Sequence, residues 1–131
     1  MIVAIGVDMA PVARFSGLLA RAPERTYARL CTPNEAAYCR SRAHPAEALA
    51  ARFAAKEAVL KCLGTGWTAG LGFAQVEVVR AASGAVSLQL HGAAAERATA
   101  LGIDRWHLGL THTEALATAF VVAERTESPS A

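Results

Sequence analysis

The sequence predicts an α+β fold: a single domain in which an antiparallel sheet, built from hairpins, packs on one long buried helix and several shorter helices. Three observations lead to this prediction. A helical stretch from Pro45 to Gly64 is almost entirely apolar, two pairs of β-type segments each flank a short turn, and other helical segments carry clear start signals. The 131 residues have the usual length of one domain, 1–131, whose polar end at 125–131 is expected to be a frayed tail.

The first thirty residues are expected to form a strand and two helices. Residues 2–7 are an apolar run that fits a buried strand ending at Asp8. Pro11 suits the first turn of a helix that extends to about residue 20, because proline lacks the N–H group that this turn leaves unpaired. A second short helix, over residues 24–30, follows the next proline.

Two further helices have stronger signals. The T-P-N-E motif at residues 32–35 is a capping box, in which the Thr and Glu side chains bond free N–H groups, and it starts a helix that ends near residue 42. The longest helix occupies 45–64, because proline suits its first turn and glycine suits the left-handed backbone at its end.

The rest of the chain is expected to be mostly β-structure. Alternating apolar and polar residues on either side of short turns indicate two hairpins, and a short amphipathic helix separates them. The expected segments are a glycine-rich loop at 65–72, the first hairpin at 73–79 and 86–90, the helix at 92–101, and the second hairpin at 106–111 and 116–123.

Composition and charge narrow the classes of function. The net charge of +2 is too small to indicate nucleic acid binding, and no apolar run approaches the roughly 20 residues needed to cross a membrane. Arg14, Arg21, Arg25 and Arg29 lie in the first thirty residues, where they either attract an acidic partner or are simply solvated on surface helices. The three cysteines have no C-x-x-C spacing, and we expect them to be reduced thiols in a cytoplasmic protein.

The long helix carries most of its charges on two edges. Arg52 and Lys56 lie on one edge, and Glu57 and Lys61 lie on another, roughly 100° away around the axis. On a helix this apolar, one edge can face water, and the other needs a counter-charge, a metal or a polar cleft. The helix alone favours an ordinary i,i+4 ion pair between Glu57 and Lys61.

Two further features suggest chemistry near Lys61. Residues 64–66 are G-T-G, and short glycine loops let backbone N–H groups approach phosphate oxygens, although such a segment is more often only a helix end. Asp8 and Glu57 are the two carboxylates placed in apolar surroundings, and hard oxygen ligands in that number suit Mg²⁺, whose shell substrate phosphates complete. Asp8 alternatively caps the helix that starts at Pro11.

With these residues the chain resembles the holo-acyl-carrier-protein synthases, the small trimeric class of 4′-phosphopantetheinyl transferases. The resemblance covers essentially the whole chain and rests on four segments in the family's order. They are I-G-V-D-M-A-P-V-A-R-F at 5–15, C-T-P-N-E at 31–35, R-F-A-A-K-E-A-V-L-K-C-L-G-T-G at 52–66, and T-H-T at 111–113 followed by A-T-A-F-V-V-A-E at 117–124. Residues 52–66 are nearly the family's central signature.

The resemblance implies transfer of phosphopantetheine from coenzyme A to a serine of an acidic acyl carrier protein, in fatty acid biosynthesis or related lipid metabolism. It implies that Asp8 and Glu57 hold Mg²⁺ and, with Lys61, form the catalytic set. Residues implied to bind coenzyme A are Arg52, Lys61, Gly64, Thr65, Gly66, Thr111, His112 and Thr113. Residues implied to dock the carrier are Arg14, Arg21 and Arg25. The family also implies a homotrimer with active sites at subunit interfaces.

Some alternatives stay open. The base that deprotonates the serine is either Glu57 or a water on the metal, and His112 is a further candidate by residue type. Two other functions also fit the residues. One is a magnesium-dependent hydrolase of nucleotides or pyrophosphate that uses Asp8, Glu57 and Lys61, and the other is a binding module whose arginines hold an acidic protein.

Overall fold

The computed structural model describes residues 1–66 and 70–127, and a three-stranded antiparallel sheet forms one layer of it. The strands are β1 (Ile2–Pro11), β5 (Leu116–Glu124) and β4 (Arg105–His112), in the order β1-β5-β4. The second predicted hairpin is therefore confirmed, and the N-terminal strand pairs with its last strand. β1 does not end at Asp8 as predicted, because its pairing with β5 continues to Pro11 opposite Leu116.

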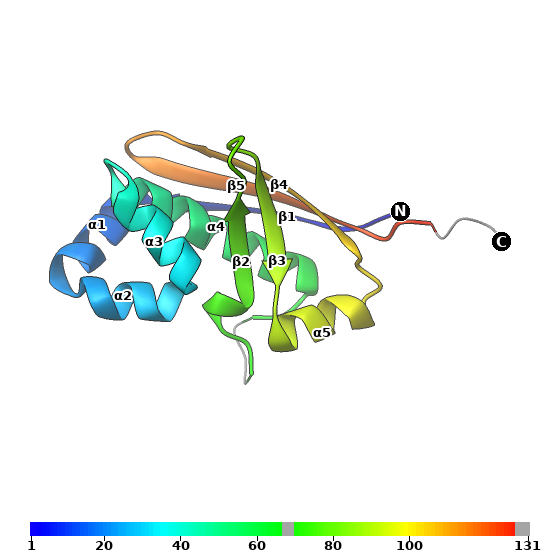
Figure 1. Cartoon of the computed structure of the whole chain (residues 1–131). Helices are drawn as coiled ribbons and strands as arrows, with labels where there is room; N and C mark the ends of the chain where they lie inside the picture. Colours follow the sequence, from blue (N-terminus) through cyan, green and yellow to red (C-terminus); the bar gives the residue numbers. More distant parts are fainter. Residues whose placement is uncertain (67–69, 128–131) are drawn as a thin grey trace.

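The long helix α4 (Pro45–Leu63) packs against one face of this sheet and lies below the strands in Figure 1. It ends at Gly64, whose φ of 69° is left-handed backbone that glycine adopts readily, so the predicted helix end is confirmed. Most of the helix is buried all round, including Arg52 and Lys56. Of the two charged edges, the one with Arg52 and Lys56 therefore points into the protein.

β1 approaches α4 closely because it carries Gly6 where it crosses the helix. A Cβ atom at this position would lie 2.9 Å from the carbonyl carbon of Ala58 and 3.2 Å from Sγ of Cys62. Residues two apart on a strand share a face, so Asp8 points toward α4 as Gly6 does. Gly6 thus sets the distance between Asp8 and the helix.

Three short helices follow β1 and pack together at one end of the molecule. They are α1 (Val12–Arg21), α2 (Pro23–Leu30) and α3 (Pro33–Ser41), coloured blue to cyan in Figure 1. The capping box of α3 is confirmed, because the amide of Glu35 donates to Thr32 Oγ1 at 3.2 Å and the amide of Thr32 donates to Glu35 Oε1 at 3.0 Å. Pro11 does not lie in the first turn of α1 but precedes it as the last residue of β1.

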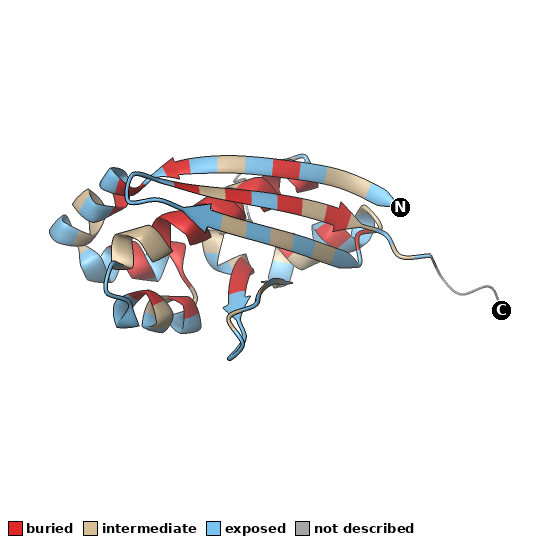
Figure 2. Ribbon diagram, turned by 90° about the horizontal axis from the view of Figure 1, so that it is seen from above, coloured by how far each residue is buried: buried red, intermediate tan, exposed pale blue. Residues whose placement is uncertain are grey.

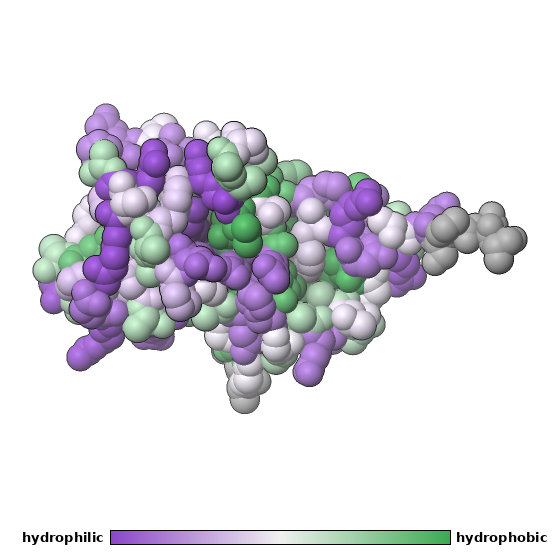
Figure 3. Space-filling view, in the orientation of Figure 1, coloured by the Kyte–Doolittle hydropathy of each residue, from purple (hydrophilic) through white to green (hydrophobic). Residues whose placement is uncertain are grey.

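The first predicted hairpin is formed by β2 (Val76–Arg80) and β3 (Val86–Leu90), which make a separate two-stranded sheet. β2 starts later than predicted, because η1 (Phe73–Gln75) is a 3₁₀ turn. Helix α5 (Gly92–Ala100) then leads to β4. Figure 3 shows hydrophilic side chains over much of the side of the molecule that carries this hairpin, around a hydrophobic patch near its centre. Helices and antiparallel strands in this arrangement confirm the α+β fold class.

The face of the three-stranded sheet that points away from α4 is open and apolar. Figure 2 looks onto this face and shows exposed positions alternating with buried ones, without a helix above them. The large apolar side chains exposed on it are Ile5, Val7, Met9, Leu116 and Phe120. We call this group the outer sheet face. Exposed apolar groups of this size are typical of surfaces that bind another molecule.

The first residues after β5 are hydrogen-bonded to the rest of the chain. The amide of Arg125 donates to the carbonyl oxygen of Met1 at 2.8 Å, and the hydroxyl of Thr126 donates to Oδ2 of Asp104 at 2.7 Å. The expected frayed tail therefore does not include these two residues, and its last part, 128–131, lies outside the described residues. The three cysteines are free and buried. Among the described helices, none has the length and apolarity needed to cross a membrane.

Candidate active site

Asp8 and Lys61 meet where β1 passes the last turn of α4. The Nζ atom of Lys61 donates to Oδ1 of Asp8 at 3.2 Å and to the carbonyl oxygen of Val7 at 2.7 Å. The lysine side chain is 55% exposed and the aspartate side chain 21%, so water screens the pair and it contributes little to folding stability. Both groups are instead accessible to a ligand.

Glu57 lies one turn before Lys61 on α4 and lines a cleft of about 550 Å³. Three aromatic rings form much of its apolar lining. The rings of Phe15 and Phe53 have centroids 5.0 Å apart, and those of Phe53 and Phe73 are stacked with centroids 5.6 Å apart. The cleft therefore combines an acidic residue with an apolar floor of packed aromatic rings.

Four arginines line the same cleft, which we call the arginine cleft. The predicted docking residues Arg14, Arg21 and Arg25 are all among them, and Arg29 joins them. The guanidinium carbon of Arg14 lies 5.0 Å from the ring centroid of Phe53, a cation–π distance. Because Glu57 is the one acid among the described lining residues, the cleft has a strongly positive potential.

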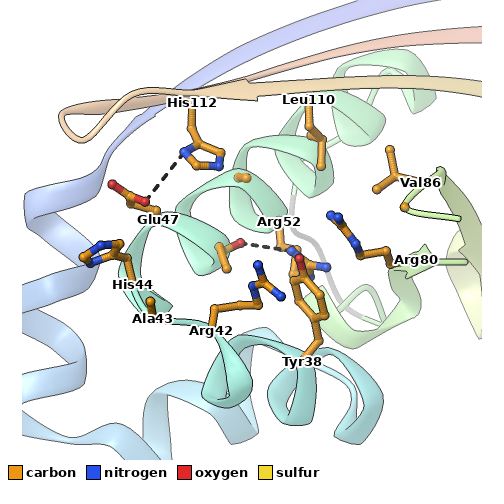
Figure 4. A pocket seen from close by; sticks show the side chains of 13 residues that line it. Tyr38, Arg42, Ala43, His44, Glu47, Arg52, Arg80, Val86, Leu110 and His112 are labelled. Atoms are coloured by element: carbon orange, nitrogen blue, oxygen red, sulfur yellow. Dashed lines mark hydrogen bonds and ion pairs between the residues drawn. The ribbon is translucent and has the colours of Figure 1, made fainter. Parts of the chain in front are cut away.

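A second cavity, of about 380 Å³, lies between α3, α4, the β2–β3 hairpin and β4 (Figure 4). We call it the basic cavity. The guanidinium carbons of Arg42, Arg52 and Arg80 lie 5.4, 4.1 and 5.3 Å from the ring centroid of Tyr38. His112 also lines the cavity, from β4. Three like charges around one ring need a counter-charge.

Arg52 has an unmet hydrogen bond in the basic cavity. Its Nη1 atom donates to the carbonyl oxygen of Ala48 at 3.3 Å, but its buried Nε atom has no partner among the described residues. Among the lining residues that the structure describes, Glu47 is the one acid, and its Oε2 atom lies 3.8 Å from Nδ1 of His112. A phosphate group would satisfy both the free N–H and the excess positive charge.

The predicted coenzyme A residues fall into two groups. Arg52 and His112 come together in the basic cavity, whereas Lys61 and residues 64–66 lie at the end of α4. Arg52 and Lys61 are nine positions apart, which is about 14 Å along a helix. Within one chain the structure therefore does not bring the two groups together.

The threonines of the predicted set have local hydrogen-bonding roles. Thr113 Oγ1 accepts two N–H groups of the β4–β5 turn at 3.2 and 3.1 Å. Thr65 Oγ1 donates to the carbonyl oxygen of Gly66 at 3.2 Å, and Thr111 pairs with Thr118 across β4 and β5. Neither Thr111 nor Thr113 lines the basic cavity.

Sequence reasoning missed a fully buried ion pair between Lys56 and Glu35. The Nζ and Oε1 atoms are 2.7 Å apart, and both side chains are 0% exposed. The expectation that Asp8 and Glu57 are the two carboxylates in apolar surroundings is therefore wrong, because Glu35 is buried more deeply. The available signal was Lys56 itself, since a lysine on a buried helix edge needs a counter-charge.

Glu77, which lies near this ion pair, and Cys62, further along α4, have shifted pKa values. Burial raises the pKa of the Glu77 carboxyl, but hydrogen bonds from His91 and Thr32 outweigh burial and hold the pKa below its usual value. Burial raises the pKa of the Cys62 thiol to about 11. At neutral pH Glu77 is therefore ionised and Cys62 is a neutral thiol.

The fold and the site define an α+β protein whose carboxylate–lysine pair, arginine cleft and basic cavity suit an anionic substrate and an acidic partner. The sequence model of the 4′-phosphopantetheinyl transferase superfamily matches residues 4–121 of this chain. The chain therefore belongs to the 4′-phosphopantetheinyl transferase superfamily, as its motifs predict.

Individual members of this superfamily are similar over nearly their full length. The chain is 44% identical to the holo-[acyl-carrier-protein] synthase of Solibacter usitatus, with 95% of this chain and 99% of that protein covered. The holo-[acyl-carrier-protein] synthase of Neisseria meningitidis has a similar crystal structure, with a TM-score of 0.85, 32% identity, and 95% and 100% of the two chains covered. The Helicobacter pylori synthase in complex with coenzyme A matches with a TM-score of 0.80, 25% identity, and 92% and 100% covered.

Proposed function

We propose that this protein transfers the 4′-phosphopantetheine group of coenzyme A to a serine of apo acyl carrier protein and releases adenosine 3′,5′-bisphosphate. Its relatives are holo-[acyl-carrier-protein] synthases, and one of them has been solved with coenzyme A. The observation that carries the proposal is that Glu57 lines the arginine cleft while Lys61, one turn further on, binds Asp8. The predicted catalytic set therefore adjoins a surface suited to an acidic protein.

The donor set at this place fits Mg²⁺. Asp8 and Glu57 provide two carboxylates, and in the described part of the chain no cluster of three or more His, Cys, Asp or Glu side chains could hold a metal ion. Mg²⁺ is typically held by one or two carboxylates, with waters and substrate phosphates completing its shell. In this proposal Asp8 and Glu57 hold the ion, which when bound supplies positive charge to the pyrophosphate of coenzyme A.

The side chains of the proposed catalytic set have separate tasks. Lys61, whose ammonium group is accessible, neutralises charge that develops on the pyrophosphate as the serine oxygen attacks the β-phosphorus. In this proposal Glu57, which lines the cleft, accepts the serine proton. Positioning and electrostatic stabilisation of this kind supply most of the catalysis in phosphoryl transfer.

The arginine cleft is the proposed docking site of the carrier protein. Its arginines attract an acidic helix, and its floor, with Phe15 and Leu18, accepts the apolar side chains of that helix. Because Arg14 lies over two of the floor rings, Phe15 and Phe53, it contributes to both parts of the surface. Docking through such exposed charges weakens as the salt concentration rises.

We further propose a homotrimer in which neighbouring copies complete each active site. Coenzyme A carries a pyrophosphate and a separate 3′-phosphate, and the structure offers two cationic places for them, Lys61 and the basic cavity, that lie apart in one chain. In the trimer, the basic cavity of one copy binds the nucleotide whose pyrophosphate lies at Lys61 of the next. The outer sheet face supplies the apolar surface that such an interface needs.

The predicted cytoplasmic location, role in fatty acid biosynthesis and single-domain organisation are part of the same proposal. The buried free thiols suit a reducing compartment. The single-domain organisation is supported because 95% of this chain matches all of the Neisseria meningitidis chain.

Incubation of apo acyl carrier protein with coenzyme A, Mg²⁺ and the protein tests the activity by mass spectrometry. The carrier is expected to gain the mass of one phosphopantetheinyl group while adenosine 3′,5′-bisphosphate appears in equal amount. Asp8→Ala and Glu57→Ala should each lower the rate by at least about 100-fold. The control Glu24→Gln, which removes an exposed ion pair with Arg40 at 3.0 Å, should leave the rate unchanged.

The same assay separates the alternative functions. Release of adenosine 3′,5′-bisphosphate without any carrier would indicate a hydrolase and refute the transferase. A protein that binds the carrier, modifies nothing and is indifferent to Glu57→Ala would be a binding module. Arg14→Ala should raise the KM for the carrier about tenfold with little change in kcat, because it removes a docking contact.

A further inference from the structure

The buried ammonium group of Lys56 is fully used in binding one segment of backbone to α4. Its Nζ atom lies 2.9 Å from the carbonyl oxygen of Phe73 and 2.6 Å from that of Val76, in addition to 2.7 Å from Oε1 of Glu35. These three acceptors use all three protons of the ammonium group. Lys56 therefore holds both ends of the 3₁₀ turn η1 against the helix.

Glu35 binds the same segment nearer its C-terminal end, at Val78. Its Oε2 atom accepts the amide of Val78 at 3.0 Å, and its Oε1 atom accepts the amide of Thr32 as well as the Lys56 proton. The pair thus joins α3 and α4 to residues 73–78. Three hydrogen bonds go from the two side chains to the backbone of this segment, and a fourth joins Lys56 to Glu35. A buried network in which every polar group has a hydrogen-bond partner fixes the position of the backbone that it binds.

Folding stability alone does not explain this arrangement. Removing two charges from water is expensive, and apolar residues of similar volume often replace a buried ion pair without loss of stability. Two apolar side chains would leave the carbonyl groups of Phe73 and Val76 without these bonds. What the pair supplies, beyond packing, is a fixed position for the backbone at 73–78.

That backbone lies beside the proposed active site. Phe73 lines the arginine cleft together with Glu57, and its ring stacks on Phe53. Lys56 immediately precedes Glu57 on α4, so the residue that holds Phe73 is fixed on the same turn of helix as the proposed metal ligand. A shift of η1 would move the wall of the cleft relative to Glu57.

We propose that Lys56 and Glu35 are positioning residues for the transfer reaction. They hold residues 73–78 on α4 so that the cleft wall formed by Phe73 keeps its distance from Glu57. The inference rests on the proposed function, because it concerns the same cleft. It assigns neither residue a contact with substrate, and it predicts that the rate of the folded protein falls when the pair is replaced.

The decisive variant replaces both charges, Lys56→Met with Glu35→Leu. We expect it to fold, because an apolar pair fills the site without burying an unpaired charge, but with a lower melting temperature, because the carbonyl groups of Phe73 and Val76 lose their bonds to Lys56. The rate is therefore measured at a temperature where the variant stays folded. We expect kcat/KM for the carrier to fall about 100-fold, since small misplacements in an active site have effects of that size. Amide hydrogen exchange should rise at least tenfold at Val78 and remain unchanged in β1 and β5.

Two results would overturn the proposal. One is a folded double variant whose kcat/KM stays within threefold of the wild type, which would make the pair purely structural. The other is a loss of rate with equal loss of exchange protection throughout the chain, which would indicate general destabilisation. The control Glu24→Gln breaks an exposed ion pair and should change neither readout.

A second variant covers the case in which the double variant does not fold. Glu35→Gln keeps the shape of the side chain and leaves Lys56 bonded to its two carbonyl groups. Because Glu35→Gln also leaves the buried Lys56 charge without its counter-charge, its melting temperature falls, and the rate is measured where the variant stays folded. A rate at least fivefold lower there, with faster exchange at Val78 and unchanged exchange in β1 and β5, supports the proposal, and a wild-type rate refutes it. Failure of the proposed function is distinguishable, because the wild-type protein would then modify no carrier while the exchange measurement still reports on residues 73–78.

Discussion

Replacement of Gly6 by alanine tests how β1 positions Asp8. The new Cβ atom would lie 2.9 Å from the carbonyl carbon of Ala58, closer than the 3.0 Å below which Cβ contacts essentially never occur, and nearer still to the carbonyl oxygen. Because the obstacle is the backbone of α4, no change of a helix side chain relieves it. β1 therefore has to move away from the helix by about 1 Å.

This displacement affects stability and activity by different amounts. Overpacking of this kind costs about 1–3 kcal/mol, which for a chain of this length lowers the melting temperature by about 4–11 °C. Asp8 lies two residues from the substitution on the same face of β1, so it moves away from Lys61 with the strand. A shift of about 1 Å at a reacting centre costs about 100-fold in kcat/KM.

The assay is carrier modification followed by mass spectrometry at a temperature where the variant stays folded, together with a thermal unfolding curve. Gly72→Ala is the matched control, because a Cβ atom at Gly72 meets nothing within 4 Å and its backbone is extended. The control should keep both its rate and its melting temperature. A Gly6→Ala protein with a wild-type rate would refute the reasoning that close packing of β1 on α4 places Asp8.

Three further predictions follow from exposure and pKa values. Phe120→Asp on the outer sheet face should convert the proposed trimer to folded monomers in light-scattering measurements, whereas unchanged mass would refute that interface. Glu77→Gln should destabilise the protein by about 1 kcal/mol at pH 7, and the difference in unfolding free energy should vanish in acid. The reason is that a carboxyl group with a lowered pKa stabilises the fold above its unfolded-state pKa. This stabilisation is lost as the pH falls through the folded-state pKa. Cys62, a buried thiol with a raised pKa, should resist iodoacetamide at pH 8 in the folded protein and react readily after unfolding in denaturant, and fast alkylation of Cys62 in the folded protein at pH 8 would contradict both its burial and its raised pKa.

Features with a local cause could be predicted from the sequence. The capping box at Thr32, the left-handed helix end at Gly64 and both hairpins depend on residues close in the chain, and all are present in the structure. Boundaries that depend on distant partners were predicted less well. β1 extends to Pro11 because β5 pairs with it, and β2 starts late because residues 73–75 form the 3₁₀ turn η1. Lys56, far away in the sequence, binds the carbonyl groups of Phe73 and Val76 at this turn.

The candidate site divides in the same way. The motifs around Asp8 and from Arg52 to Gly66 indicated the family and the residues that carry its chemistry, because those residues are close in sequence and have a recognisable spacing. Only the tertiary structure joins Lys61 to Asp8, 53 positions apart, and places Arg14 in one cleft with Glu57. A motif of neighbouring residues cannot show that two residues this far apart in the sequence are in contact.

The sequence alone thus determined the fold class, the family and the two charged edges of the long helix. The tertiary structure decided which edge is buried and what it meets there: Lys56 finds Glu35, and Arg52 lies against Tyr38 in a cavity shared with two other arginines. The physical reason is that a buried charge needs partners in three dimensions, and residues far away in the chain supply them.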